Sequence, residues 1–437
     1  MRNLAMAGMG FFLLTACGET AERAPAEPGA APGTETTAAP MPVLAVATTD
    51  EPIVLPSPAT GLAFWEHPSL PFEGMVIAAT ENGLFAHQPE GKEAETIVST
   101  FRAHGAALTY LPGPLFVDEP DTANRVMSAQ ALFVSYDLDQ SAYRFFGIDN
   151  ISGILTEDFL SLPVRTQRSK PADFCLMAAQ GEETALRFTL VALEADAVSV
   201  YRFAQTASAV GGQRPWSIAS ETYPTSLTAL SCANDPGTDR LLILDDVGTV
   251  HGFNPATGIT NPLFDTGIEG AAGLGVHRRG LAETAAGDLE KLTFVVDSTS
   301  GQVTLFRLPD GAPVGAIKLT AFDVNEGVIE TSALAVASGN FGGLYRAGVV
   351  ALAARSNFFE AEPADPAPQS QEADDKAEIP VASVNAIRLT PFVAVRNALE
   401  LTPGTVIGAR QRDQTASSGV IVPPIVDIEL DLAPVTP

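Results

Sequence analysis

A chain of 437 residues, 46% of them hydrophobic, is long enough for two or three ordinary domains or for one large all-β domain with an extensive core. The formal net charge of −27 at pH 7 argues against nucleic acid as a partner, because a phosphate-binding surface needs clustered Lys and Arg. Such an acidic protein also repels anionic lipids and anionic substrates unless cations such as calcium intervene.

Residues 1–16 have the organisation of a bacterial lipoprotein signal peptide. Arg2 supplies a positive charge, Leu4–Leu14 is an apolar segment too short to span a bilayer, and the sequence LTAC places small residues before Cys17. This resembles a lipobox and predicts that Cys17 is acylated, so that lipid chains anchor the protein to a membrane. The alternative is an ordinary cleaved signal with a chance cysteine. We expect a protein of the bacterial cell envelope, at the outer membrane or in the periplasm.

Two segments are predicted to lack packed structure. Residues 17–45 are rich in Ala, Pro and Glu and cannot bury enough apolar surface to offset their conformational entropy, which predicts a disordered tether. Residues 360–380 are acidic and Pro-rich, which predicts a loop inserted between two strands. The folded domain is then expected at residues 46–400, followed by a C-terminal extension at 401–437.

A short apolar run, a polar turn and a second apolar run recur six times within the expected domain. The runs begin near Val76, Leu132, Leu190, Leu241, Leu292 and Gly348. Runs of this length suit strands, and turn residues such as Asn82-Gly83 favour hairpins. A period of about 50 residues in an all-β chain predicts a six-bladed β-propeller. The alternative, two β-sandwich domains, does not produce one period across the chain.

Cysteines and histidines give few other signals. Cys175 and Cys232 lie in similar contexts and can form a disulfide in an oxidising compartment, or remain two buried thiols. His277 precedes two arginines, which suggests either a phosphate clamp or a loop after an inner strand, and His251 is expected to point outward from a strand. The sequence contains no Gly-rich phosphate loop, zinc-type histidine pair or Gly-x-Ser-x-Gly motif.

Framework residues along the chain resemble those of the β-propeller phytases. Residues 63–93 are similar to the first blade of that family, with Trp65, His67 and Pro68 at its Ile-Trp-x-His-Pro turn. Further similar segments follow in order at Pro171–Ala179, Thr228–Pro255, Gly267–His277, Val295–Leu308, Glu330–Ala354 and Ser383–Phe392. The resemblance covers Ile53 to Ala398 and rests on spacing and framework residues.

The resemblance implies a 3-phytase, a calcium-dependent phosphomonoesterase acting on phytate. In that family, clustered carboxylates hold calcium ions, cationic side chains bind phosphate, and a metal-bridged water attacks phosphorus. The residues that match the family's acidic positions, and are therefore the candidate calcium ligands, are Asp245, Asp246, Glu269 and Asp297. Asp245 and Asp246 can equally form an ordinary hairpin turn.

Several family positions are replaced in this sequence. Ala59 and Thr60 stand where the family has two aspartates, Thr331–Val336 lacks the acidic residues of the sixth blade, and His104–Tyr110 lacks the Asp and Arg of the second. We therefore expect a monomeric, phytase-like protein with weak or lost hydrolase activity toward phosphorylated inositol. The alternative is a non-catalytic propeller that binds or scaffolds an envelope protein.

Overall fold

The computed structural model describes residues 42–47, 53–89, 95–98, 100–111, 131–157, 164–165, 170–178, 187–205, 216–235, 238–281, 289–320, 328–358, 382–401 and 404–406. The chain divides into the units Met1–Pro40 and Met41–Pro437, and all described residues belong to the second. The signal peptide with Cys17, most of the predicted tether and the acidic insertion at 360–380 lie outside the described residues.

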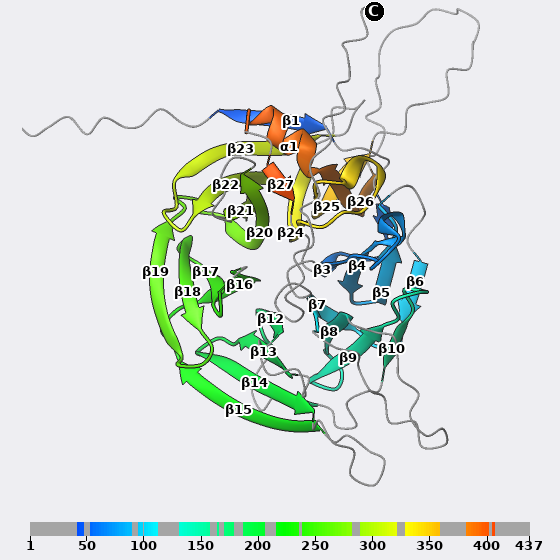
Figure 1. Ribbon diagram of the computed structural model, residues 1–437, viewed down its shortest axis with the longest axis vertical. Helices are drawn as coiled ribbons and strands as arrows, with labels where there is room; N and C mark the ends of the chain where they lie inside the picture. Colours follow the sequence, from blue (N-terminus) through cyan, green and yellow to red (C-terminus); the bar gives the residue numbers. More distant parts are fainter. Residues whose placement is uncertain are drawn as a thin grey trace, which may run out of the picture. The chain divides into compact units, whose positions relative to one another are not determined.

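Six small, mainly antiparallel sheets form a ring, so the predicted six-bladed β-propeller is confirmed (Figure 1). Blade 1 contains β3 (Ala59–Trp65), β4 (Met75–Thr80), β5 (Gly83–His87) and β6 (Glu95–Val98). Blade 2 contains β7 (Ala103–Tyr110), β8 (Ala131–Asp137), β9 (Ala142–Ile148), β10 (Leu155–Glu157) and β11 (Val164–Arg165). Blade 3 contains β12 (Asp173–Ala178), β13 (Arg187–Leu193), β14 (Ala197–Gln205) and β15 (Trp216–Pro224).

The remaining blades follow the same plan. Blade 4 contains β16 (Ala229–Asn234), β17 (Leu241–Asp245), β18 (Thr249–Asn254) and β19 (Ile259–Asp265). Blade 5 contains β20 (Ala271–Leu281), β21 (Leu289–Asp297), β22 (Gln302–Leu308) and β23 (Pro313–Thr320). Blade 6 contains β24 (Val328–Ala337), β25 (Val349–Phe358) and β26 (Ala382–Pro391). The first strand of each blade contacts the first strands of both neighbouring blades, so these six inner strands surround the axis of the ring.

Segments outside the repeat close and extend the ring. The strand β2 (Ile53–Leu55) pairs antiparallel with β26 and completes blade 6. The strand β1 (Val43–Ala47) pairs parallel with β23, so the tether predicted to reach residue 45 ends earlier than expected. After β26, the helix α1 (Phe392–Ala398) contacts β1, and β27 (Gly404–Val406) pairs with the end of β20.

Stacking of the blades explains why the apolar runs in the sequence are continuous. All seven residues of β8 and all five of β17 are buried, because sheets cover both faces of these middle strands. Trp65 is fully buried in the apolar cluster between blades 1 and 2. Blades 2 and 3 meet through aromatic rings, with those of Phe188 and Phe203 stacked at 4.3 Å within this junction.

The turns divide between two faces of the ring. We define the hairpin face by the turns between the second and third strands of the blades, at residues 81–82, 138–141, 194–196, 246–248 and 298–301. We define the η face by the opposite turns, which include the 3-10 helices η1 (Pro71–Glu73) and η2 (Gly343–Tyr345). The two faces position the candidate sites described below.

Candidate functional site

The four predicted calcium ligands lie on the hairpin face of blades 4 and 5. Asp245 ends β17 and is followed by Asp246, Glu269 precedes β20, and Asp297 ends β21. The fold therefore brings these residues to neighbouring blades, as the resemblance implies. Their suitability as metal ligands depends on what their carboxylate oxygens already bind.

Asp245 uses both of its carboxylate oxygens within its own blade. Its Oδ1 accepts hydrogen bonds from the backbone N–H of Val247 and of Thr249, at 3.2 and 2.7 Å, and its Oδ2 lies 2.8 Å from Nε2 of His251. Both Asp245 and His251 are buried, so the prediction that His251 points outward is wrong. The carboxylate holds the β17–β18 turn in place and is not open to solvent.

Asp297 is engaged in a similar way in blade 5. Its Oδ1 accepts hydrogen bonds from the backbone N–H and the hydroxyl of Thr299, at 2.9 and 2.7 Å, and its Oδ2 accepts one from Ser300 Oγ at 2.7 Å. Partial burial raises the pKa of Asp297, but the hydrogen bonds from Ser300 and Thr299 outweigh it and hold the pKa below its ordinary value. The anion is thus stabilised by the turn that it caps.

The same position recurs in other blades, which explains the role of both carboxylates. Asp245 and Asp297 stand opposite Ala229 and Ala271 at the ends of their strand pairs. In blade 2, Asp137 occupies this place opposite Ala103 and accepts hydrogen bonds from two backbone N–H groups. Asp at the first position of a turn is favoured because it bonds the backbone locally. These carboxylates are turn caps of the blade repeat.

Glu269 and Asp246 are exposed on the hairpin face. Gly270 lies so close to Asp297 that a side chain there would collide with its carboxylate, which places the backbone of Glu269 beside Asp297. Among the described residues, no three His, Cys, Asp or Glu side chains form a group able to hold a metal ion. Calcium takes six to eight oxygen ligands, and two of the four candidates are already capping turns. The donors therefore do not fit the calcium cluster that the resemblance implies.

Five inner strands begin with a β-bulge near the hairpin face. The strands β3, β7, β16, β20 and β24 each change register there, and the residues inserted include Thr60, Ala106, Leu230, Ala272 and Ser332. Bulges are over-represented next to active sites because they redirect side chains. All five of these residues are uncharged, so the bulges bring neither a metal ligand nor a phosphate-binding cation toward the axis.

Two titratable groups near the same ends of the inner strands, the half-buried Asp173 and the buried His104, were not anticipated from the sequence. Asp173 of blade 3 accepts hydrogen bonds from Ser231 Oγ and the backbone N–H of Cys232 in blade 4, at 3.0 and 2.9 Å, and burial raises its pKa to about 6. Nε2 of His104 lies 3.1 Å from the carbonyl of Pro171, and burial, aided by Lys170, lowers its pKa to about 4. In the sequence, the one sign that Asp173 links two blades is its position at the start of an inner strand.

Cys175 and Cys232 form a disulfide between the inner strands of blades 3 and 4, with their Cα atoms 6.1 Å apart. His277 is fully buried within β20, its Nε2 lies 3.0 Å from the carbonyl of Ala347, and its ring stacks on Phe392. The prediction that His277 lies on a loop is therefore wrong, because β20 continues to Leu281. His277 has a packing role between blades 5 and 6.

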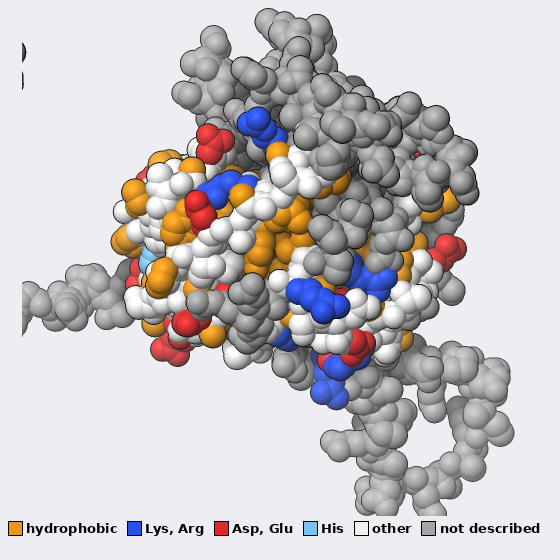
Figure 2. Space-filling model, turned by 90° about the horizontal axis from the view of Figure 1, so that it is seen from below, with side chains coloured by type: hydrophobic (Ala, Val, Ile, Leu, Met, Phe, Trp, Pro, Cys, Tyr) orange, Lys and Arg blue, Asp and Glu red, His pale blue; other side chains and the backbone are white. Residues whose placement is uncertain are grey.

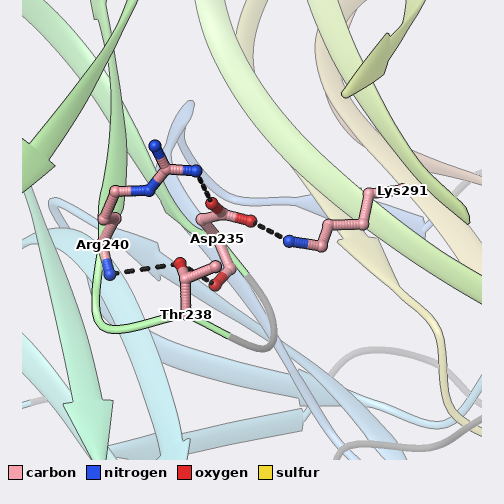
Figure 3. Close-up of polar contacts among 4 residues, drawn as sticks. All are labelled: Asp235, Thr238, Arg240 and Lys291. Carbon is pink, nitrogen blue, oxygen red and sulfur yellow. Dashed lines mark hydrogen bonds and ion pairs between the residues drawn. The ribbon is translucent and has the colours of Figure 1, made fainter. Parts of the chain in front are cut away.

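A second charged cluster joins blades 4 and 5 near the η face (Figure 3). Asp235 is buried, and its two oxygens lie 2.8 Å from the Arg240 guanidinium and 2.5 Å from Lys291 Nζ. Thr238 donates a hydrogen bond to the Asp235 carbonyl at 2.9 Å. Because each carboxylate oxygen already has a cationic partner, this cluster is a structural link.

The surface is not uniformly acidic, in spite of the net charge. Figure 2 shows Lys and Arg side chains close to Asp and Glu side chains, with apolar atoms between them. Arg202 of blade 3, for example, lies 2.9 Å from Glu221. The local arrangement of charges, more than their sum, therefore decides where a ligand can bind.

No protein-family model matches the sequence, and no curated protein is significantly similar to it. The phytase resemblance therefore stays a prediction. No helix among the described residues has both the length and the apolar character needed to cross a membrane.

Proposed function

We propose that this propeller is a partner-binding module of the bacterial cell envelope, anchored by lipid at Cys17. We further propose that its framework resembles that of a phytase but that it has no efficient phytase activity. The observation that carries the proposal is the use of Asp245 and Asp297 as turn caps. A calcium-dependent phosphatase needs these oxygens as ligands. Here they are occupied by hydrogen bonds that hold the hairpins.

The hairpin face offers chemistry suited to a cationic partner. Exposed carboxylates occur on it in blades 1 to 4 and in the loop that leads into blade 5, at Glu81, Asp139, Asp196, Asp246, Asp265 and Glu269. Arg102 offsets two of them, lying 3.1 Å from Glu81 and 3.8 Å from Asp139. Val247, 71% exposed, adds an apolar side chain next to Asp246. Complementary charge speeds association and selects partners, while a desolvated apolar contact adds affinity.

One observation favours residual hydrolysis as a second candidate function. Glu269 lies beside Asp297, so that a local rearrangement of the β21–β22 turn would place two carboxylates together. Under this alternative the ligand is phytate or another phosphorylated inositol.

Phosphate release from phytate separates the two candidates. We expect the purified lipidated protein to release no phosphate in a calcium-dependent manner and to keep its Tm within about 1 °C when calcium is added, because no ligand set is open. Calcium-dependent release that Glu269→Gln abolishes would contradict the proposal and establish the phytase. Asp196→Asn, an exposed carboxylate of blade 3, is the matched control.

A photoreactive amino acid at Val247 tests partner binding in intact cells. We expect one specific crosslinked envelope protein, lost when Asp246→Lys and Glu269→Lys reverse the local charge and retained in a Lys170→Gln control. A crosslinking pattern that is unchanged by the charge reversal would refute electrostatic binding at this face.

A further inference from the structure

Five large apolar side chains are exposed on the η face, and we call them the η patch. They are Leu70, Phe72, Ile151, Ile154 and Leu344, with exposed fractions of 43%, 50%, 81%, 61% and 63%. They come from the η1 turn of blade 1, the β9–β10 turn of blade 2 and the η2 turn of blade 6. A set of apolar side chains of this kind on a soluble domain marks an interaction surface.

The buried ring of His67 joins two of these turns. Its Nδ1 accepts hydrogen bonds from the backbone N–H of Ser69 and Leu70, at 3.1 and 2.9 Å. Its Nε2 donates to the carbonyl of Ile151 at 3.4 Å. One imidazole therefore holds backbone groups of both Leu70 and Ile151, which fixes these turns of blades 1 and 2 relative to each other.

The third turn packs directly on the first. Gly342 has φ 79°, and a side chain there would lie 3.1 Å from the Cβ and backbone of Phe72. The backbone N–H of Asn340 donates to Glu66 Oε1 at 3.2 Å, a second link between these turns. Leu344 is thus held beside η1, and the η patch has a defined shape.

The first strand of the folded unit begins on the side of the η face. The strand β23 starts after the turn at residues 309–312, on the η face, and β1 runs parallel to it with Val43 opposite Ala316 and Ala47 opposite Thr320. The chain that precedes Val43 therefore leaves β1 toward the η face. The helix α1 contacts both β1 and η2, which places the start of β1 and the η patch on the same side.

The predicted lipid attachment site is close to this point in sequence. Cys17 is separated from Val43 by a segment rich in Ala, Pro and Glu. A disordered tether of this length, as predicted from the sequence, would have an end-to-end distance of about 30 Å and would keep the η face of an anchored protein within reach of the bilayer.

Charges of both signs border the η patch: Glu66, Glu73 and Asp149 lie in its turns and accept hydrogen bonds within the protein, whereas two arginines stand beside it. Arg346 follows η2 and is exposed, and Arg396 lies on α1. Apolar side chains bordered by Arg are typical of proteins that insert into the headgroup region of a membrane. A second copy of a chain with net charge −27 is a poorer occupant, because like charges repel.

We infer that the η patch docks on the lipid surface that holds the anchor, so that the hairpin face points away from the membrane. This inference uses the anchoring part of the proposed function and is independent of which ligand the hairpin face binds. Its chemistry is insertion of the apolar side chains between headgroups, with Arg346 contacting lipid phosphates.

Fluorescent labels on the lipidated protein in vesicles test the orientation. Ser69→Cys and Val247→Cys place a label beside the η patch and on the hairpin face, respectively, and both positions are exposed. In vesicles of the zwitterionic lipids phosphatidylcholine and phosphatidylethanolamine that carry a headgroup quencher, we expect strong quenching at position 69 and little at 247. Phe72→Ser with Leu344→Ser should lower the docked-to-undocked ratio about tenfold, since two half-exposed apolar side chains are lost.

The controls make the outcome decisive. Thr222→Ala, an exposed outer-strand substitution, should leave the quenching at position 69 unchanged, and an unchanged Tm should show that the double variant is folded. Equal quenching at the two labels, or no effect of the double variant, would overturn the inference. So would failure of the protein to float with vesicles, or protection of position 69 that depends on protein density, which would indicate self-association. None of these readouts involves phytate, calcium or the hairpin-face partner.

Discussion

The junction between blades 3 and 4 and the junction between blades 4 and 5 join the same kinds of strands with different chemistry. Blades 3 and 4 share the Cys175–Cys232 disulfide and the Asp173 carboxylate, which accepts hydrogen bonds from neutral donors. Blades 4 and 5 are linked by Asp235, whose carboxylate has two cationic partners. One junction should therefore respond to reductant and pH, and the other to loss of a charge. The blade repeat sets where the strands meet, and individual residues set how they are held.

Removal of the disulfide should have the largest effect. The two cysteines are 57 residues apart, and in the chain-entropy model closing a loop of this size stabilises the fold by about 4 kcal/mol. We expect Cys175→Ser with Cys232→Ser to lower the free energy of unfolding by this amount in urea titrations. Reductant should destabilise the parent protein and leave the double variant unaffected. Equal stability of parent and variant would mean that the junction does not depend on the covalent bond.

Asp235→Ala should cost about 3 kcal/mol of unfolding free energy. The substitution leaves the Lys291 and Arg240 cations without their common buried partner, and breaking a buried ion pair from one side is strongly destabilising. Asp139→Ala, at a surface pair with Arg102, is the matched control and should cost less than about 1 kcal/mol. Similar losses in both variants would show that the blade 4–5 junction does not rely on Asp235.

Asp173→Asn should have the smallest effect, and one that depends on pH. Since the folded-state pKa of about 6 is above the ordinary value of 3.8, the folded protein binds the proton more tightly, and this contribution is present below pH 4 and lost as pH rises through 6. Allowing for partial exposure, the parent should lose about 2 kcal/mol relative to the variant between pH 4 and 7. The difference between the two proteins is the quantity to measure, because His104, with its pKa lowered to about 4, acts in the opposite direction. A difference that is independent of pH would contradict the assignment.

The six blades could be predicted because their middle strands carry their own signal. Strands such as β8 and β17 are buried on both faces and appear in the sequence as apolar runs at a regular period. The strands β1 and β2 could not be predicted in the same way. They are five and three residues long, and their partners β23 and β26 lie near the other end of the chain. Pairing at such a distance leaves no local pattern.

The positions of the candidate site residues could be predicted from the sequence, but the groups that their side chains contact could not. The resemblance placed Asp245 and Asp297 on neighbouring blades, where the structure has them. The hydrogen bonds that their carboxylate oxygens accept depend on the geometry of the turns, which the identity of single residues does not reveal. His251 alternates with apolar residues and was expected outside, yet it turns back toward Asp245. Asp173 was missed because its partners Ser231 and Cys232 belong to another blade.

The pairing of β2 with β26 has a consequence for biosynthesis. Leu55 is made long before its partner Asn385, so the strand that completes the last blade waits through the synthesis of nearly the whole domain. Until then β2 has no strand partner, and its backbone groups are prone to pair with other chains. Closure late in folding joins the early and late parts of the polypeptide in one sheet, so a fragment that lacks either part leaves blade 6 incomplete. Nascent chains of this protein should therefore depend on chaperones until the ring is closed.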